Sequence, residues 1–364
     1  MSQPQLSPPE YDNPGALIAG SVIMWIVSTA CVGLRFYSKR WKRQGYITAD
    51  WLIVVAAVFA TGMTVMEIYG VEEHALGYPL GASIEDPKAV NGRLNKAKHI
   101  ELSFLLLGIA ALGFIKLSVS FLFWHLFARV VFRRFLMVWI AILIVWTLAF
   151  VLGGLLECGS HLKAIFGTPQ DYLDHCGSAI PTGYAMVGSD VATDLITLLI
   201  PIPVIFSMKM DKRTRILTLL TFMIGALSVG ASVAKAYIYI KGSMGLWTSD
   251  AISMLTGLSI WNLAEVHIGI IAACGPTLRP ILARIIPTES IMSLMSLLGV
   301  SSNATKQNEL PSFVKMPDAD SAEQLQPGAE KVISKGADGP HGIRQYELES
   351  WNDVESERRG QNNV

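Results

Sequence analysis

Long apolar stretches alternate with short polar segments along most of the chain. Seven of these stretches are close to the roughly 20 residues that an α-helix needs to cross the hydrocarbon core of a bilayer. They cover Leu17–Leu34, Trp51–Tyr69, Leu102–Phe127, Phe135–Leu156, Tyr184–Met208, Ile216–Ile240 and Ala251–Ala273. Backbone groups in lipid must be satisfied within their own segment, and the alternation of barrel strands is absent. The pattern therefore predicts an all-α membrane protein, a bundle of seven transmembrane helices.

Composition distinguishes this prediction from its alternative, a soluble helical bundle. Hydrophobic residues make up 51% of the chain and charged residues only 16%, against about 25% charged in ordinary soluble domains. A soluble bundle would need a polar face on every helix. The first and fourth apolar stretches contain no charged residue, so lipid is the expected solvent.

The distribution of Lys and Arg predicts the orientation. Fourteen of them, Arg35 and Lys39 included, flank the spans on one side, and six flank them on the other. Because positive residues favour the cytosolic side, we expect the N-terminus outside and the C-terminus in the cytosol. We expect no cleavable signal ahead of the first span, so this span should act as its own signal and anchor in the plasma membrane or a secretory-pathway membrane.

These features divide the chain into four parts. Residues 1–16 form an outer N-terminal segment, and residues 17–286 form the seven-helix membrane domain, in which Pro276 and Pro280 should close the last helix. Residues 287–300 are apolar but too short to span, so they are expected to form an interfacial helix. Residues 301–364 lack a hydrophobic period and are predicted to be a disordered cytosolic tail.

Two of the four cysteines fall in the second outer loop. Cys158 and Cys176 would meet the oxidising secretory pathway there, and we predict a disulfide between them. Two free thiols are the alternative, because spacing alone does not establish bond geometry.

Ionisable residues inside the apolar stretches are the main candidates for function, because charge at membrane depth is costly. They are Glu67, Lys116, Asp190, Asp194, Lys235 and Glu265, together with Glu101 at the outer edge of the third stretch. Counting positions from the outer end of each span predicts two pairs, Lys116 with Glu265 and Asp190 with Lys235. Asp190 and Asp194 lie four residues apart and should share one helix face. Since acids outnumber bases, we expect at least one acid to remain protonated.

Two interpretations of this polar cluster stay open. The buried groups could only hold the helices together, or they could line a pocket open to the outside, completed by Trp261 and Asn262. Ligand recognition and proton or ion movement are both compatible with such a pocket. A small-residue stripe at Ala226, Gly230 and Ala234 predicts a close helix contact.

Other chemistry finds little support in the sequence. His74, His161 and His175 lie near acids in the outer loops, but no zinc-ligand spacing such as HExxH occurs, so surface histidines are favoured over a metal site. Phosphate-binding glycine loops, nucleophile elbows and dinucleotide fingerprints are absent. We expect no metal, no cofactor and no nucleic-acid partner.

Several segments together resemble the fungal rhodopsin-like membrane proteins, also called the satratoxin-cluster type. They are LRFYSKRW and ADWLI around the first inner loop, IKLSVSFLFWHLF in the third span, the paired loop cysteines, DVATDLITLLIPIPVIFSMKM in the fifth span, LSVGASVAKAYIY in the sixth and AEVHIGIIAACGPTLRPIL in the seventh. The resemblance covers roughly residues 15–286 and is specific as a set of motifs.

The resemblance implies receptor-like proteins of filamentous fungi or products of secondary-metabolite gene clusters. The family's polar positions correspond here to Asp50, Lys116, Asp190, Asp194, Glu265, Pro276, Arg279, Cys158 and Cys176. Two positions depart from the family pattern, because Ala49 replaces the first of two aspartates and Lys235 replaces an arginine. Retinal is not expected, since Ala251–Ala273 contains no lysine for a Schiff base.

The sequence thus favours a non-enzymatic receptor-like sensor or a membrane accessory of a fungal secondary-metabolite pathway. Its small-molecule ligand would bind in the outer half of the bundle, and its inner loops and tail could contact a cytosolic protein. The rival class is a membrane enzyme or proton-coupled transporter that uses Asp190, Asp194 and Glu265 for proton transfer.

Overall fold

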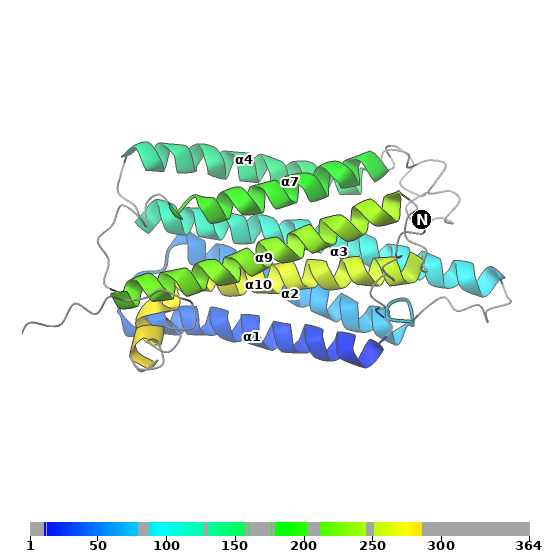
Figure 1. Cartoon of the computed structure of the whole chain (residues 1–364), viewed down its shortest axis with the longest axis horizontal. Helices are drawn as coiled ribbons and strands as arrows, with labels where there is room; N and C mark the ends of the chain where they lie inside the picture. The colour runs from blue at the N-terminus through cyan, green and yellow to red at the C-terminus, as the bar shows by residue number, and fades with distance from the viewer. Residues whose placement is uncertain are drawn as a thin grey trace, which may run out of the picture. The chain divides into compact units, whose positions relative to one another are not determined.

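A computed structural model describes residues 11, 13–78, 87–126, 130–156, 159, 176, 179–202, 212–244 and 251–285. The side chains of residues 87–91, 179, 212–217, 251 and 279–285 are not included in this description. All regular elements in these ranges are helices (Figure 1). They are α1 (Pro14–Trp41), α2 (Thr48–Glu72), α3 (Pro87–Leu126), α4 (Val130–Leu155), α7 (Ala179–Leu199), α9 (Lys212–Ser243) and α10 (Ala251–Ile285).

Each helix corresponds to one of the seven predicted spans, which confirms an all-α membrane bundle. Six of them, all but α7, are long and apolar enough to cross a bilayer. The fifth predicted span, Tyr184–Met208, includes residues 203–208, which lie outside the described ranges. The orientation of the termini stays a prediction. For reference, we name the end where α1, α3, α7 and α10 begin the outer end and the opposite end the inner end.

Several helices extend beyond the apolar stretches that predicted them. Asn13 caps α1, because its side-chain oxygen accepts a hydrogen bond from the Ala16 amide at 3.1 Å, and Pro14 occupies the first turn. The helix continues seven residues past Leu34 to Trp41, so Arg35 and Lys39 lie within α1, whereas the sequence indicated an inner loop. Both side chains are buried.

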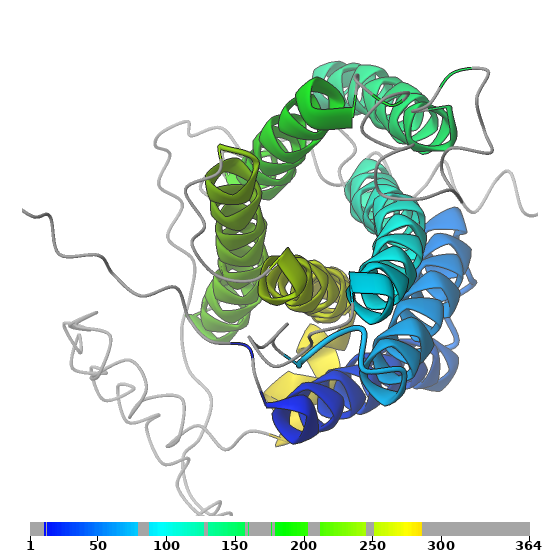
Figure 2. The same cartoon turned by 90° about the vertical axis from the view of Figure 1, so that its right-hand side faces the viewer.

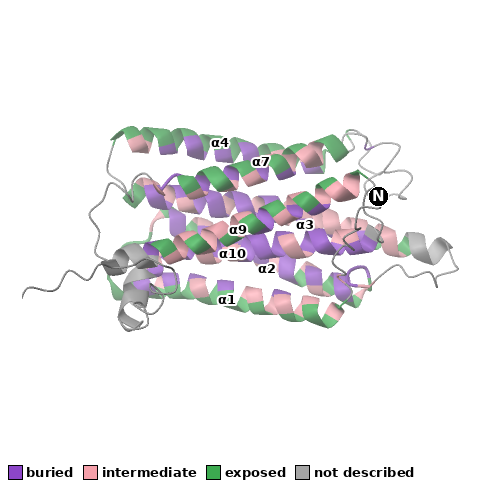
Figure 3. Cartoon of the chain, in the orientation of Figure 1, coloured by how far each residue is buried: buried purple, intermediate pink, exposed green. Residues whose placement is uncertain are grey.

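Helix α10 is the most enclosed part of the bundle. It contacts α1, α2, α3 and α9, while α4 contacts α3 (Figure 2). Figure 3 shows buried residues along most of α10 and exposed residues along the outward face of α4. That face carries large apolar side chains such as Val131, Val138 and Val145. Exposed apolar side chains of this kind are typical of a lipid-facing surface.

The prediction that Pro276 and Pro280 close the last helix is wrong. Helix α10 continues through both prolines to Ile285, and its last turns bend away from the rest of the helix (Figure 1). Proline removes one backbone donor and bends a helix, but neighbouring groups can satisfy the freed carbonyls. Residues 287–300 and 301–364, predicted as an interfacial helix and a disordered tail, lie outside the described residues.

Close helix contacts occur at other glycines than the predicted stripe. A Cβ atom at Gly230 would meet nothing within 4 Å, and this residue is exposed. A Cβ atom at Gly113 of α3 would lie 2.6 Å from Cγ2 of Thr147 on α4, so the two backbones approach closely there. The four-residue spacing of the predicted stripe identifies one face of α9, but it does not show whether that face contacts another helix.

Candidate functional site: a buried charged network between two cavities

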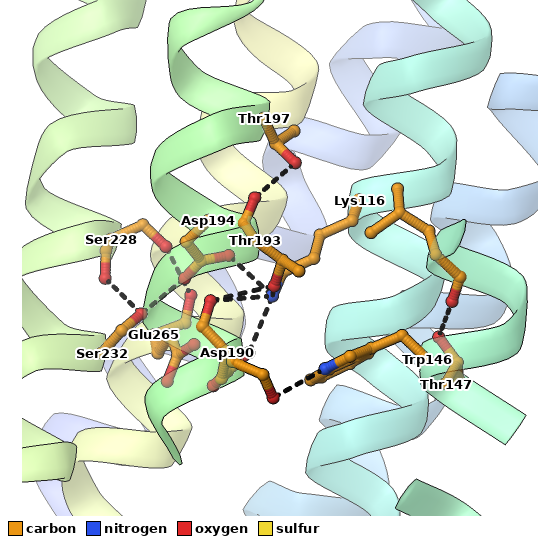
Figure 4. Close-up of polar contacts among 12 residues, drawn as sticks. Lys116, Trp146, Thr147, Asp190, Thr193, Asp194, Thr197, Ser228, Ser232 and Glu265 are labelled. Carbon is orange, nitrogen blue, oxygen red and sulfur yellow. Dashed lines mark hydrogen bonds and ion pairs between the residues drawn. The ribbon is translucent and has the colours of Figure 1, made fainter. Parts of the chain in front are cut away.

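Five of the seven predicted site residues form one network of ion pairs inside the bundle. Figure 4 shows four of them, Lys116, Asp190, Asp194 and Glu265. Asp190 of α7 is its central member. Its Oδ1 accepts from Nζ of Lys116 on α3 at 2.7 Å, and its Oδ2 accepts from Nζ of Lys235 on α9 at 2.6 Å. One carboxylate thus connects two lysines from different helices.

Lys116 has further partners on α7. Its Nζ lies 3.0 Å from Oδ1 of Asp194 and donates to Oγ1 of Thr193 at 2.7 Å. It also lies 4.7 Å from the ring centre of Trp146 on α4, a cation–π arrangement. Asp194 accepts a second hydrogen bond at its other oxygen from Ser232 Oγ, at 2.5 Å. The Lys116 ammonium therefore contacts three acceptor side chains and one aromatic face.

Glu265 of α10 completes the network with fewer contacts. Its Oε2 lies 2.6 Å from Lys235 Nζ. Its Oε1 has no hydrogen-bond partner among the described residues, and the residue is fully buried. Ser228 donates only to the backbone carbonyl of Glu265. Glu265 therefore depends on an ammonium that it shares with Asp190.

The predicted pairs are partly correct. The Asp190–Lys235 pair is confirmed, but the Lys116–Glu265 pair is wrong, because Lys116 pairs with Asp190 and Asp194 while Glu265 pairs with Lys235. Depth counted along each span ignores the rotation of a helix about its axis, and long lysine side chains reach partners at other depths. The expectation that Asp190 and Asp194 share one face is confirmed.

A cavity of about 300 Å³ lies on the outer side of the network. It is enclosed by α3, α4, α7, α9 and α10, and its walls are mainly apolar, including Leu105, Phe150 and Leu258. Lys235, Asn262 and Glu101 supply polar groups. A few polar groups in an apolar enclosure are typical of small-molecule sites. We call it the outer cavity.

A second cavity of about 240 Å³ lies on the inner side. It is enclosed by α3, α7, α9 and α10, and Lys116 and Asp194 line it together with apolar residues such as Phe123 and Phe222. We call it the inner cavity. The network thus contacts the outer cavity through Lys235 and the inner cavity through Lys116 and Asp194.

Of the two remaining predicted pocket residues, Asn262 lines the outer cavity and Trp261 does not. Asn262 lines the outer cavity and donates to the Phe104 carbonyl at 3.4 Å. Trp261 lines neither cavity; its Nε1 donates to the hydroxyl of Tyr11 at 2.9 Å. Cys176 is buried, but Cys158 lies outside the described residues, so the disulfide stays a prediction.

Sequence reasoning missed a second charged cluster near the inner end. Asp50 of α2 accepts from Arg35 Nε at 2.9 Å, from Lys39 Nζ at 2.5 Å and from the Ile47 amide at 2.8 Å. Arg35 also donates to the Ala273 carbonyl of α10 at 2.8 Å. These contacts join α1, α2 and α10 beside the bend of α10. The motif LRFYSKRW contained the signal, but Arg35 and Lys39 were counted as loop charges.

His267 was also missed, although it is an ionisable residue inside an apolar stretch. Its Nδ1 lies 2.8 Å from Ser28 Oγ and its Nε2 lies 3.1 Å from Thr64 Oγ1. Both ring nitrogens are therefore satisfied by hydroxyl groups of α1 and α2. His267 connects three helices and faces away from the two cavities.

The sequence matches one protein-family model and resembles two proteins of fungal biosynthesis clusters. The sequence model of the fungal rhodopsin domain matches residues 34–284. The chain is 27% identical over 271 residues to the polyenoic acids biosynthesis gene cluster protein Ba17b of Metarhizium anisopliae, covering 70% of each chain. It is 24% identical over 290 residues to the phomoidride biosynthesis cluster protein H of a fungal species, covering 74% of this chain and 88% of that one.

A third relative carries a different description. The chain is 24% identical over 153 residues to Receptor GIN3 of Arthrobotrys oligospora, a match covering 40% of this chain and 34% of the receptor. No solved structure matches the chain.

Proposed function

Because the chain belongs to the fungal rhodopsin domain family, we propose that it is a non-enzymatic membrane protein that binds a small molecule in the outer cavity. It acts either as a receptor-like sensor or as a membrane accessory of a secondary-metabolite pathway. Two relatives are described as proteins of biosynthesis clusters and one as a receptor, which supports these two roles. The proposal places the N-terminus outside and the inner loops and tail in the cytosol, where they would contact a protein partner.

The outer cavity is the observation that carries the proposal. Its volume of about 300 Å³ is at the lower end of the range for small-molecule sites, which is roughly 300–1,000 Å³. Apolar walls favour a hydrophobic molecule, while Lys235 and Asn262 offer donors to an oxygen of that molecule. Since Lys235 also belongs to the charged network, a ligand that contacts its ammonium would change the contacts of Asp190 and Glu265.

Binding of a fluorescent conjugated polyenoic acid to the protein in nanodiscs tests the proposal, with the methyl ester and the corresponding alcohol as comparison probes. Leu105→Phe adds volume in the outer cavity, and Leu152→Phe makes the same change on the exposed face of α4. We expect saturable binding that Leu105→Phe weakens at least about tenfold, or roughly 1.4 kcal/mol, and that Leu152→Phe leaves unchanged. Equal binding by all three proteins, or none above protein-free nanodiscs, would contradict the proposal.

A proton-coupled transporter is the second candidate. The inner cavity favours it, because the network then separates two cavities that lie toward opposite ends of the bundle. Uptake of the same probe into proteoliposomes under a pH gradient distinguishes the candidates. Loss of pH-dependent uptake in folded Asp194→Asn would favour transport, whereas wild-type binding without uptake would favour the sensor.

A further inference from the structure

The charges of the network do not balance. Asp190, Asp194 and Glu265 contribute three carboxyl groups, and Lys116 and Lys235 contribute two ammonium groups. If all five were ionised, the network would carry one net negative charge in the interior of a membrane protein. An uncompensated buried charge is strongly unfavourable, and a buried acid usually binds a proton instead.

Among the described residues, the charged groups near the network do not supply the missing positive charge. Lys98 and Glu101 both line the outer cavity and have opposite charges. Glu67, on α2, adds another acid. His267 follows Glu265 by two residues but its ring contacts hydroxyl groups of α1 and α2, and α4 contributes only the Trp146 ring over Lys116.

Contacts within the network identify the carboxyl group that best accommodates a proton. Asp190 has both lysines as partners, and Asp194 has Lys116 together with the Ser232 hydroxyl. Glu265 shares Lys235 with Asp190, and its Oε1 is buried without a hydrogen-bond partner among the described residues. Glu265 is therefore the acid whose negative charge is least compensated.

We infer that the network holds one exchangeable proton on the carboxyl group of Glu265, and that this proton exchanges with the inner side of the membrane through Asp194 and the inner cavity. Protonated Glu265 makes the network neutral, with two carboxylates facing two ammonium groups. This inference concerns the bundle itself and does not depend on the identity of any ligand in the outer cavity.

The exchange route follows from the positions of the three acids. Carboxylate oxygens of Asp190, Asp194 and Glu265 all lie within 4.8 Å of one another. The Asp194 side chain is 11% exposed, the largest exposed fraction in the network, and it lines the inner cavity. None of the three acids lines the outer cavity, where the network presents only the Lys235 ammonium. On exchange, the O–H bond of Glu265 breaks as its proton passes to a water molecule between the two carboxyl groups, and this water gives a proton to Asp194. Asp194 releases a proton to water in the inner cavity, and the reverse steps return a proton from that water to Glu265.

Infrared difference spectroscopy of the full-length protein in nanodiscs tests where the proton is held. The spectrum of wild type minus Glu265→Gln should show a carboxylic acid C=O band, and this band should shift when the protein contains ¹³C-labelled glutamate. Asp190→Asn should remove the same glutamic acid band, because two acids then face two lysines and no proton is needed. Glu67→Gln is the control for other buried acids and should leave this band in place.

Two results would overturn the assignment of the proton. One is a wild-type band that shifts with labelled aspartate and not with labelled glutamate. The other is a glutamic acid band that persists unchanged in both Glu265→Gln and Asp190→Asn. Labelling uses the wild-type protein, so the first of these results can overturn the assignment even if a variant does not fold.

Exchange of the same band in D₂O tests the route. Gly269 lines the inner cavity, and a Cβ atom there would meet its neighbours at ordinary distances of 3.5 Å or more. Gly154 lines the outer cavity and provides the corresponding glycine-to-leucine change, with a Cβ atom 3.3 Å from Cδ2 of Leu106. Gly269→Leu should slow deuterium exchange of the Glu265 band at least tenfold, while Gly154→Leu should exchange like wild type. Unchanged exchange in Gly269→Leu, or slowing only in Gly154→Leu, would overturn the inner route.

Discussion

Replacement of Asp50 by Asn should strongly destabilise the protein, although Asp50 lies outside the charged network. Its carboxylate is fully buried and accepts hydrogen bonds from Arg35, Lys39 and the Ile47 amide. Asparagine keeps the size of the side chain and removes its charge. Arg35, which is also fully buried, then loses its carboxylate partner.

The expected size of the effect follows from these contacts. Removal of one partner of a buried ion pair costs roughly 3–5 kcal/mol, because the other charge remains in a low-dielectric environment. The Arg35 hydrogen bond to the Ala273 carbonyl cannot replace a negative charge. Native proteins are stable by only about 5–15 kcal/mol, so this loss is a large fraction of the total free energy of unfolding.

Titration with a denaturing detergent measures this loss, with labelling of the buried Cys274 thiol as the signal for unfolding. Glu72→Gln is the matched acid-to-amide control, because Glu72 is exposed. This variant should unfold at the same detergent concentration as the wild-type protein. The double variant Arg35→Met with Asp50→Asn should recover at least about half of the lost stability, since the unpaired guanidinium is gone. A loss below about 1 kcal/mol in Asp50→Asn, or no recovery in the double variant, would refute the reasoning.

Three further predictions concern the outer end of the molecule. Peptide mapping without reductant should find Cys158 linked to Cys176, and free alkylation of both thiols would contradict the disulfide. The Lys96 ammonium, 2.5 Å from Glu73, holds the pKa of the Glu73 carboxyl group below its usual range. Lys96→Met should raise this pKa in ¹³C NMR titrations. In the wild-type protein, the small stabilisation by this pair should be lost as the pH falls through the lowered pKa. Finally, Gly108→Ala should displace Asn262, because a Cβ atom would lie 2.5 Å from its Nδ2, and should weaken probe binding without loss of helix by circular dichroism.

The existence and order of the helices could be predicted from the sequence because lipid imposes a simple length requirement. Each of the seven apolar stretches overlaps one described helix. Helix ends were less predictable. Arg35 and Lys39 extend α1 because Asp50 on α2 compensates their charge, and this partner becomes apparent only when the two helices are packed together.

The ion-pair partners within the charged network could be predicted only in part, because they too depend on how the helices pack together. The cost of burying charge correctly grouped Lys116, Asp190, Asp194, Lys235 and Glu265. The pairing within this group depends on helix rotation and on the reach of lysine side chains, which a linear count of depth does not include. Trp261 is a further example, because its indole meets Tyr11 instead of the outer cavity.

A double-mutant cycle between Lys116 and Lys235 tests most directly whether the five residues act as one network. The two ammonium groups have the same charge, and Asp190 is the group that both of them contact. Lys116→Met and Lys235→Met are each expected to leave Asp190 with one partner, and together with none, so their effects on the free energy of unfolding should couple by roughly 1–3 kcal/mol. Additive effects within about 0.5 kcal/mol would contradict a shared network.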